Sequence, residues 1–252
     1  METKKVTRWK ASGIHLLISA AIAATVLAVM LQLWFPGRLF VAGGGNDLLF
    51  ILVSVDVIIG PLITLAVYRQ GKWGMKFDLV VIAALQVSAL AYGMHIVYLA
   101  RPAFIVFVKD QFQVASVVDI PPEDYAKAKY PQFSHPPAGG PLWVFSDYPT
   151  DPEQRNEVTW AALSGRDMET FPQFFAPYDQ RRQEVLKAAW TLAKLRELEP
   201  ADSKIVDAFV KEEGLQEDAV RYVRLKAQRA WAAVLIDAKT AEPLEMVITE
   251  QI

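Results

Sequence analysis

Three long apolar runs within the first 100 residues constrain this chain more than any other feature. They cover residues 14–35, 48–68 and 79–99, and each has the roughly 20 residues that a helix needs to cross about 30 Å of hydrocarbon. A backbone in lipid must satisfy its own hydrogen bonds, and a helix does so within one segment. The sequence therefore predicts a bundle of three transmembrane helices in a transmembrane domain of residues 1–100.

The first run resembles a signal peptide only superficially. It is longer than the apolar region of a signal peptide, and it continues into LWFPGRLF without a small-x-small cleavage site. We therefore expect it to be retained as a membrane anchor.

Basic residues around the three runs predict their orientation. The N-terminal METKKVTRWK carries four basic residues, among them Lys4 and Lys5, and the second loop, RQGKWGMKFD, carries three. The first loop, PGRLFVAGGGND, carries one. Because basic residues favour the cytoplasmic side, the N-terminus and the second loop are expected there. The first loop and the chain after Arg101 are then expected in the periplasm, with the helices in the inner membrane.

In residues 101–252, short apolar segments are separated by polar and turn-forming segments, as in an ordinary folded domain. The segments AFIVFV and FQVASVV predict two strands with a turn at residues 109–111, and LWVFSDYP predicts another strand. The C-terminal part predicts a meander of three strands, and helices are predicted at three places, residues 152–163, 178–198 and 203–211. We expect a periplasmic α+β domain with a small, mostly antiparallel sheet.

Composition argues against several classes of function. The chain has no cysteine, which excludes disulfides, zinc–thiolate sites, iron–sulfur clusters and thiol nucleophiles. Residues 1–100 carry a net charge of +4 and residues 101–252 carry −6, so the second part has no basic field for nucleic acid. There is no GxGxxG, P-loop or HExxH motif, and His135, the one histidine after residue 100, lacks metal spacing. We predict no enzymatic activity, cofactor or metal.

Several aromatic residues in the second part have two interpretations. They form an exposed patch for a partner, or they fill the core, which is the favoured interpretation. The residues are Trp143, Phe171, Phe174, Phe175 and Tyr178.

The second apolar run contains the unusual segment DVIIGPLITLAVY, in which a carboxylate and a helix breaker lie in a lipid-soluble stretch. A charge at mid-bilayer costs on the order of 3 kcal/mol, so Asp56 is expected to face protein or water. Pro61 lacks an N–H and is expected to kink the helix, and Gly60 leaves a notch beside it. Gln86 of the third run lies at a similar depth, so we expect an Asp56–Gln86 hydrogen bond.

Three interpretations of this polar face remain open. Asp56, Gly60, Pro61 and Gln86 fasten the three helices together, or they line a groove for the transmembrane helix of a partner protein. An ion pathway is the weakest interpretation because only one acid is present. A stripe of Ala20, Ala24 and Ala28 in the first run is expected to serve packing within the protein.

The segments RWKASGIHLLIS, VDVIIGPLITLAVY and KFDLVVIAALQVSALAYGMHIVYLARPAFIVFVKDQFQVASVVDI together resemble the TfpX/TfpZ family of type IV pilin accessory proteins. The resemblance covers residues 8–120 and continues more loosely through GGPLWVF and FFAPYD. One departure is Ile59, where the family more often has leucine. The matching positions include Arg8, Trp9, Lys10, His15, Asp56, Gly60, Pro61, Thr64, Lys76, Phe77, Asp78, Gln86, Tyr92, Gly93, Arg101, Pro102 and Phe107.

This resemblance implies an inner-membrane protein, without cofactor or catalysis, that helps a cognate major pilin to be stabilised or assembled into a type IV pilus. Pilin subunits wait in the membrane on one apolar helix and carry a globular periplasmic head. The resulting hypothesis is chaperone-like: the polar face binds the pilin helix, and residues 101–252 recognise the head and supply specificity. The alternative is a membrane-anchored sensor or signalling adaptor with a periplasmic input domain.

Overall fold

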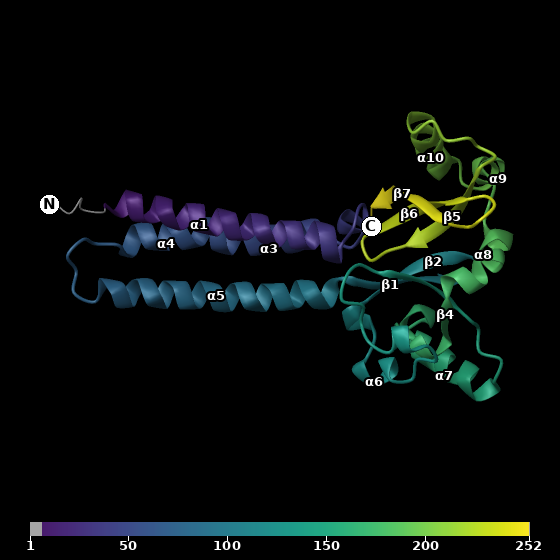
Figure 1. The fold of residues 1–252 in the computed structure, drawn as a ribbon, viewed down its shortest axis with the longest axis horizontal. Coiled ribbons are helices and arrows are strands. Elements are labelled where there is room, and N and C mark those ends of the chain that lie inside the picture. The colour runs from purple at the N-terminus through teal and green to yellow at the C-terminus, as the bar shows by residue number, and fades with distance from the viewer. Residues whose placement is uncertain (1–6, 252) are drawn as a thin grey trace. The chain divides into compact units, whose positions relative to one another are not determined.

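The computed structural model of the chain describes residues 7–251 and divides into two compact units (Figure 1). The helical unit contains Gly45–Leu99 and the preceding chain up to Leu33. The sheet unit contains Trp34–Gly44 and the chain from Ala100 onward. Lys4 and Lys5, two of the basic residues used to predict the orientation, lie outside the described residues.

Three helical spans in the described residues are long and apolar enough to cross a membrane: Arg8–Trp34, Gly45–Val67 and Met75–Ala100. The first consists of α1 (Arg8–Val29), followed by the π-helical η1 (Met30–Trp34). The second joins α3 (Gly45–Val53), the π-helical η2 (Ser54–Ile59) and α4 (Gly60–Val67). The third is α5 (Met75–Ala100). All three predicted helices are present, and each begins a few residues earlier than its apolar run.

The first helix begins early because polar residues can form its first turn. Thr7 is the N-cap, and its side chain accepts a hydrogen bond from the backbone N–H of Lys10. Apolarity alone marks the part of a helix that suits lipid, whereas capping and hydrogen bonding set where the helix begins.

The first two spans form an antiparallel hairpin. The start of α1 packs on α4 at the end of the second span, where Ser12 Oγ donates to the carbonyl of Pro61 at 2.9 Å. Nearby, His15 Nδ1 and Thr64 Oγ1 are joined by a hydrogen bond of 2.6 Å. By contrast, 6% of the most apolar window of α5 is buried, against 28% for the second span. The third helix is therefore much less enclosed than the second.

The sheet unit is built on seven described strands in the order β4-β3-β1-β2-β5-β6-β7. Four neighbouring pairs are antiparallel, but β1–β3 and β2–β5 are parallel. The strands are β1 (Pro102–Val108), β2 (Gln111–Ser116), β3 (Leu142–Ser146), β4 (Phe175–Pro177), β5 (Val220–Lys226), β6 (Ala230–Asp237) and β7 (Pro243–Gln251).

The prediction of a small, mostly antiparallel sheet was therefore wrong. The sheet is mixed, and it joins strands β1 to β4 with the C-terminal strands β5 to β7. The hairpin of β1 and β2 and the meander of β5 to β7 form as predicted, since short turns connect antiparallel neighbours. Lys109, with a φ of 57°, makes the tight turn after β1. The parallel pairs require long crossovers through loops and helices, and local patterns carry no signal for which distant strand will become the neighbour.

Short helices cover the sheet. They are α6 (Pro122–Tyr125), α7 (Pro152–Leu163), α8 (Arg182–Ala188), α9 (Leu192–Leu198) and α10 (Pro200–Glu212), with single 3₁₀ turns η3 (Val117–Asp119), η4 (Pro131–Phe133), η5 (Met168–Thr170), η6 (Pro172–Phe174) and η7 (Tyr178–Arg181). The predicted helix of residues 178–198 is instead η7, α8 and α9. It breaks where Trp190 pairs with Tyr222 of β5 through two backbone hydrogen bonds of 2.8 Å.

The aromatic residues with two interpretations belong to the core. Phe171, Phe174, Phe175 and Tyr178 are buried, and Trp143 is half-buried against Phe112. The alternative of an exposed aromatic patch at these five positions was wrong.

The connection between the first two spans folds into the sheet unit. It contains α2 (Leu39–Ala42), whose Leu39 and Ala42 are buried among strand residues of the core. The carbonyl of Ala42 accepts a hydrogen bond of 3.0 Å from the N–H of Arg229, and the guanidinium of Arg38 lies 5.6 Å from the ring centre of Phe209. Segments that follow the first and the third apolar helices thus share one folded unit.

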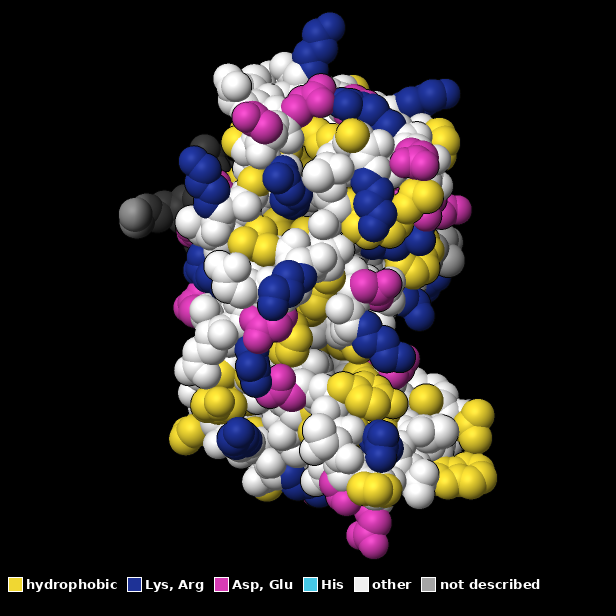
Figure 2. All heavy atoms as spheres, turned by 90° about the vertical axis from the view of Figure 1, so that its right-hand side faces the viewer, with side chains coloured by type: hydrophobic (Ala, Val, Ile, Leu, Met, Phe, Trp, Pro, Cys, Tyr) yellow, Lys and Arg dark blue, Asp and Glu magenta, His cyan; other side chains and the backbone are white. Residues whose placement is uncertain are grey.

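The surface of the sheet unit mixes charges of both signs. On the face shown in Figure 2, Lys and Arg side chains are interspersed with Asp and Glu, and hydrophobic side chains lie between them. Among the ion pairs of the sheet unit, Arg196 pairs with both Asp207 and Glu217 at 2.8 Å.

Candidate functional site in the helical unit

The second span changes its helical geometry beside Pro61. The N–H of Gly60 donates to the carbonyl of Val55, five residues earlier, which is the hydrogen bond of a π-turn. Pro61 has no N–H with which to continue the usual ladder, so the wide turn of η2 lies where the regular pattern is interrupted. Such π-turns within α-helices are frequent at functional sites, and Asp56 lies inside this one.

Asp56 is buried in the helical unit, with 7% of its surface exposed. Its Oδ1 atom has no hydrogen-bond partner among the described residues. The expected Asp56–Gln86 hydrogen bond does not form in this part of the chain, where Gln86 instead lies against Gly60. Asp56 is the central residue of the 23-residue span Gly45–Val67, so its carboxylate lies as far from both helix ends as this span allows.

Gly60, Pro61 and Gln86 fasten the helices to one another. A β-carbon added at Gly60 would clash with Gln86 Nε2 and lie 3.2 Å from His15 Nε2, so the side chains of Gln86 and His15 contact α4 closely here because this residue is glycine. The carbonyl of Pro61 is held by Ser12. Among the four predicted site residues, these three lie in the contact between helices, and Asp56 faces a cavity.

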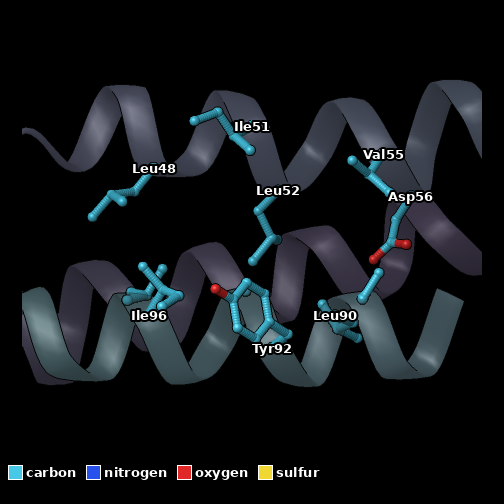
Figure 3. A pocket seen from close by; sticks show the side chains of 11 residues that line it. Leu48, Ile51, Leu52, Val55, Asp56, Leu90, Tyr92 and Ile96 are labelled. Carbon is cyan, nitrogen blue, oxygen red and sulfur yellow. The ribbon is translucent and has the colours of Figure 1, made fainter.

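That cavity, here called the α3–α5 slot, has a volume of about 440 Å³. Figure 3 shows Asp56 at one end beside Leu90, and Leu48 and Ile96 at the other. One wall comes from α3 and η2, and the other comes from α5. The lining residues are Leu48, Ile51, Leu52, Val55, Asp56, Ala89, Leu90, Tyr92, Gly93, Ile96 and Val97.

Asp56 is the one carboxylate in a lining that is otherwise almost wholly apolar. The slot therefore offers contact surface to an apolar group and one strong hydrogen-bond acceptor. Its volume lies within the roughly 300–1,000 Å³ that is typical of clefts for small ligands, so it accommodates a few side chains.

The small-residue stripe has a different environment from the one expected. Ala20, Ala24 and Ala28 are all exposed in the structure, so the stripe does not serve packing within the chain.

Other polar side chains of the sheet unit have local structural roles. Asp151 caps α7 by accepting a hydrogen bond from the N–H of Gln154, and Asp147 pairs with Arg181 at 3.0 Å. His135 contacts the carbonyl of the adjacent Pro136. No group of three or more potential metal ligands occurs among the described residues.

A polar cavity in the sheet unit escaped the sequence analysis. It has a volume of about 440 Å³ and brings Glu169 of η5 beside Arg166 and Lys226. Burial raises the pKa of Glu169 to about 7, and the nearby Asp167 acts in the same direction. No signal in the segment RDMETFP marks this glutamate, because its burial arises from strands and turns distant in sequence.

Known proteins place the chain in a family. A fimbrial assembly protein of serogroup I from Dichelobacter nodosus is 32% identical over 188 residues, which cover 73% of this chain and 72% of the relative. The chain belongs to a family of fimbrial assembly proteins. The family model described as fimbrial assembly protein FimB matches residues 3–37, which include the RWKASGIHLLIS segment. The serogroup E1 protein of the same organism is 30% identical over 192 residues, covering 73% of this chain and 72% of that relative.

These relatives confirm the predicted resemblance at the level of fimbrial assembly proteins. The narrower TfpX/TfpZ assignment stays a prediction. No solved structure matches the chain.

Proposed function

We propose that this protein is an inner-membrane accessory factor of type IV fimbrial biogenesis that binds a cognate major pilin and aids its stability or assembly. The observation that carries the proposal is the similarity to fimbrial assembly proteins over almost three-quarters of the chain. The proposed role is chaperone-like binding, and it requires neither catalysis nor a cofactor.

The proposed topology has three membrane crossings, with the N-terminus in the cytoplasm and the sheet unit in the periplasm. Its first support is the excess of basic residues before α1 and in the second loop. Its second support is α2, whose Ala42 is hydrogen-bonded to Arg229 within the sheet unit. Three antiparallel crossings bring the ends of the first and third helices to the same side, as a shared folded unit requires.

In this proposal the two units of the chain bind different parts of the pilin. An apolar helical unit with an open slot suits the single membrane helix of a pilin. A sheet unit with a surface of mixed charge suits the polar surface of a pilin head, where electrostatic complementarity supplies specificity.

The proposal is tested by crosslinking and co-purifying the full chain from membranes of piliated cells and identifying the partners by mass spectrometry. The major pilin is expected to dominate. Exchanging residues 101–252 for those of a relative with another cognate pilin is expected to transfer the preference. The matched control exchanges residues 1–100 instead.

Recovery of the protein without pilin, from cells in which deletion of its gene leaves piliation unchanged, would refute the proposed function. Recovery of pilin with no dependence on residues 101–252 would remove specificity from the sheet unit while leaving the accessory role in place.

A further inference from the structure

We propose that the membrane helix of the pilin packs along the α3–α5 slot and inserts side chains into it, and that Asp56 accepts a hydrogen bond from a donor group on that helix. This inference rests on the proposed function and deepens it, because it assigns the binding site to one face of the helical unit and states the chemistry that the bound helix must carry.

The first argument concerns the space between the helices. The hairpin of the first two spans is closed by the contacts of Ser12 with Pro61 and of His15 with Thr64, so a further helix cannot enter there. Gln86 brings α5 against Gly60 at one level. From that level the slot lies between α3 and α5 and extends from Asp56 toward Leu48 and Ile96 (Figure 3).

The second argument concerns the walls of the slot. On the α5 side they include Ala89, whose small, exposed side chain permits close approach of another helix. The space at Gly93 is taken by Leu52 of this chain, because a β-carbon there would lie 3.1 Å from Leu52 Cδ1. A further helix therefore packs along the slot and not between α3 and α5. The remaining lining is aliphatic, apart from Tyr92 and Asp56, and it matches the side chains of an apolar helix.

The third argument concerns Asp56 and identifies the occupant. A buried carboxylate oxygen without a partner is costly at this depth of a membrane span. An acyl chain of a lipid has no hydrogen-bond donor and would leave this cost in place. A partner helix that presents a hydroxyl, an amide or an ammonium group removes this cost by donating a hydrogen bond to the oxygen.

The absence of cysteine from the chain allows a direct test, because every introduced cysteine is unique. In the full-length protein, Ala89→Cys places a thiol in the slot, whereas the control Ala91→Cys places one on an exposed position of the same helix outside it. Each variant is crosslinked in native membranes to cysteines placed along the apolar segment of the co-produced pilin. We expect the yield from Ala89→Cys to exceed that from Ala91→Cys by roughly tenfold.

A second set of variants tests the carboxylate. In the Ala89→Cys protein, Asp56→Leu is expected to lower the crosslinking yield by roughly tenfold or more, as the loss of a buried hydrogen bond implies. Asp56→Asn retains an acceptor oxygen and is expected to keep most of the yield. Equal yields for wild type, Asn and Leu would overturn the role of Asp56. Immunoblots of total protein establish that each variant accumulates in the membrane.

The outcomes separate this inference from the proposed function. If the wild type co-purifies pilin but the crosslinks form equally or preferentially from Ala91→Cys, the slot assignment is wrong and the accessory role stands. If the wild type retains no pilin, both are wrong. Labelling of the slot by a photoactivatable acyl chain to the same extent with and without pilin would identify it as a lipid site and overturn the inference.

Discussion

The side-chain amide of Gln86 lies against Gly60 so closely that a β-carbon at Gly60 would be 2.0 Å from Gln86 Nε2 and 2.9 Å from Gln86 Cδ. This contact joins α5 to the hairpin of the first two spans at the level where the slot begins. The clashing atoms belong to the end of a flexible side chain, so the contact predicts a specific pattern of destabilisation and rescue.

Gly60→Ala alone is expected to destabilise the helical unit by about 1 kcal/mol. Overpacking costs roughly 1–3 kcal/mol, and the better helix propensity of alanine offsets up to about 1 kcal/mol of that cost. In a Gln86→Ala background only the tight contact with His15 Nε2 at 3.2 Å remains, and Gly60→Ala should cost clearly less than it does alone. Thermal unfolding of the detergent-solubilised full chain measures the four members of this cycle, and an identical effect of Gly60→Ala in both backgrounds would refute the proposed contact.

The bond between His15 and Thr64 is expected to stabilise the hairpin by a modest amount. Polar contacts between membrane helices contribute about 0.6 kcal/mol on average, so the isosteric Thr64→Val should cost about that much. In a protein that already carries His15→Leu, the same substitution should have almost no effect. A double-mutant cycle measures this coupling energy, with Thr25→Val, an exposed position on α1, as the control. Additive effects of the two substitutions would show that the bond contributes nothing.

Arg101 is expected to be important for the stability of the sheet unit. It is fully buried, and it donates to the carbonyls of Gly139 at 2.9 Å and Pro137 at 2.6 Å. Hydrogen bonds from a charged donor contribute about 1.5–3 kcal/mol each, so Arg101→Met should lower the free energy of unfolding by about 3 kcal/mol or more. Arg101→Lys should cost less because one donor contact can be retained.

The matched control for Arg101 is Arg155→Met, at an exposed position on α7. Denaturant titration followed by tryptophan fluorescence is the measurement. A cost for Arg101→Met no larger than that for Arg155→Met would contradict a structural role for the buried guanidinium.

Glu169 predicts a pH dependence of stability in the sheet unit. Because burial raises its pKa from the ordinary 4.5 to about 7, the folded state holds the proton more tightly than the unfolded state. The free energy of unfolding should therefore fall as the pH rises from about 4.5 to about 7, by up to about 3 kcal/mol. Denaturant titrations at several pH values measure this slope. Glu169→Gln should flatten the slope across this window, and an unchanged slope in that variant would assign it to other groups.

Local features determined a substantial part of this structure. Runs of about 20 apolar residues predict three helices because hydrocarbon leaves a single segment few alternatives. The start of α7 was predicted correctly because Asp151 and Pro152 act as a cap and a first helical residue within one turn. The hairpin of β1 and β2 and the C-terminal meander depend on short turns, which the sequence also encodes locally.

Tertiary structure alone decided the parallel pairs of the sheet, the interruption of residues 178–198 at Trp190 and the burial of Glu169, since each arises from segments far apart in the chain. It also decided which of the four predicted site residues lie in the contact between helices and which faces the slot. The sequence identified Asp56, Gly60, Pro61 and Gln86 as unusual in an apolar segment, because polar and helix-breaking groups are costly there. Only the packing of the three helices placed Gly60, Pro61 and Gln86 in the contact between helices and left Asp56 facing the slot, because helix rotation and depth depend on neighbours rather than on local sequence.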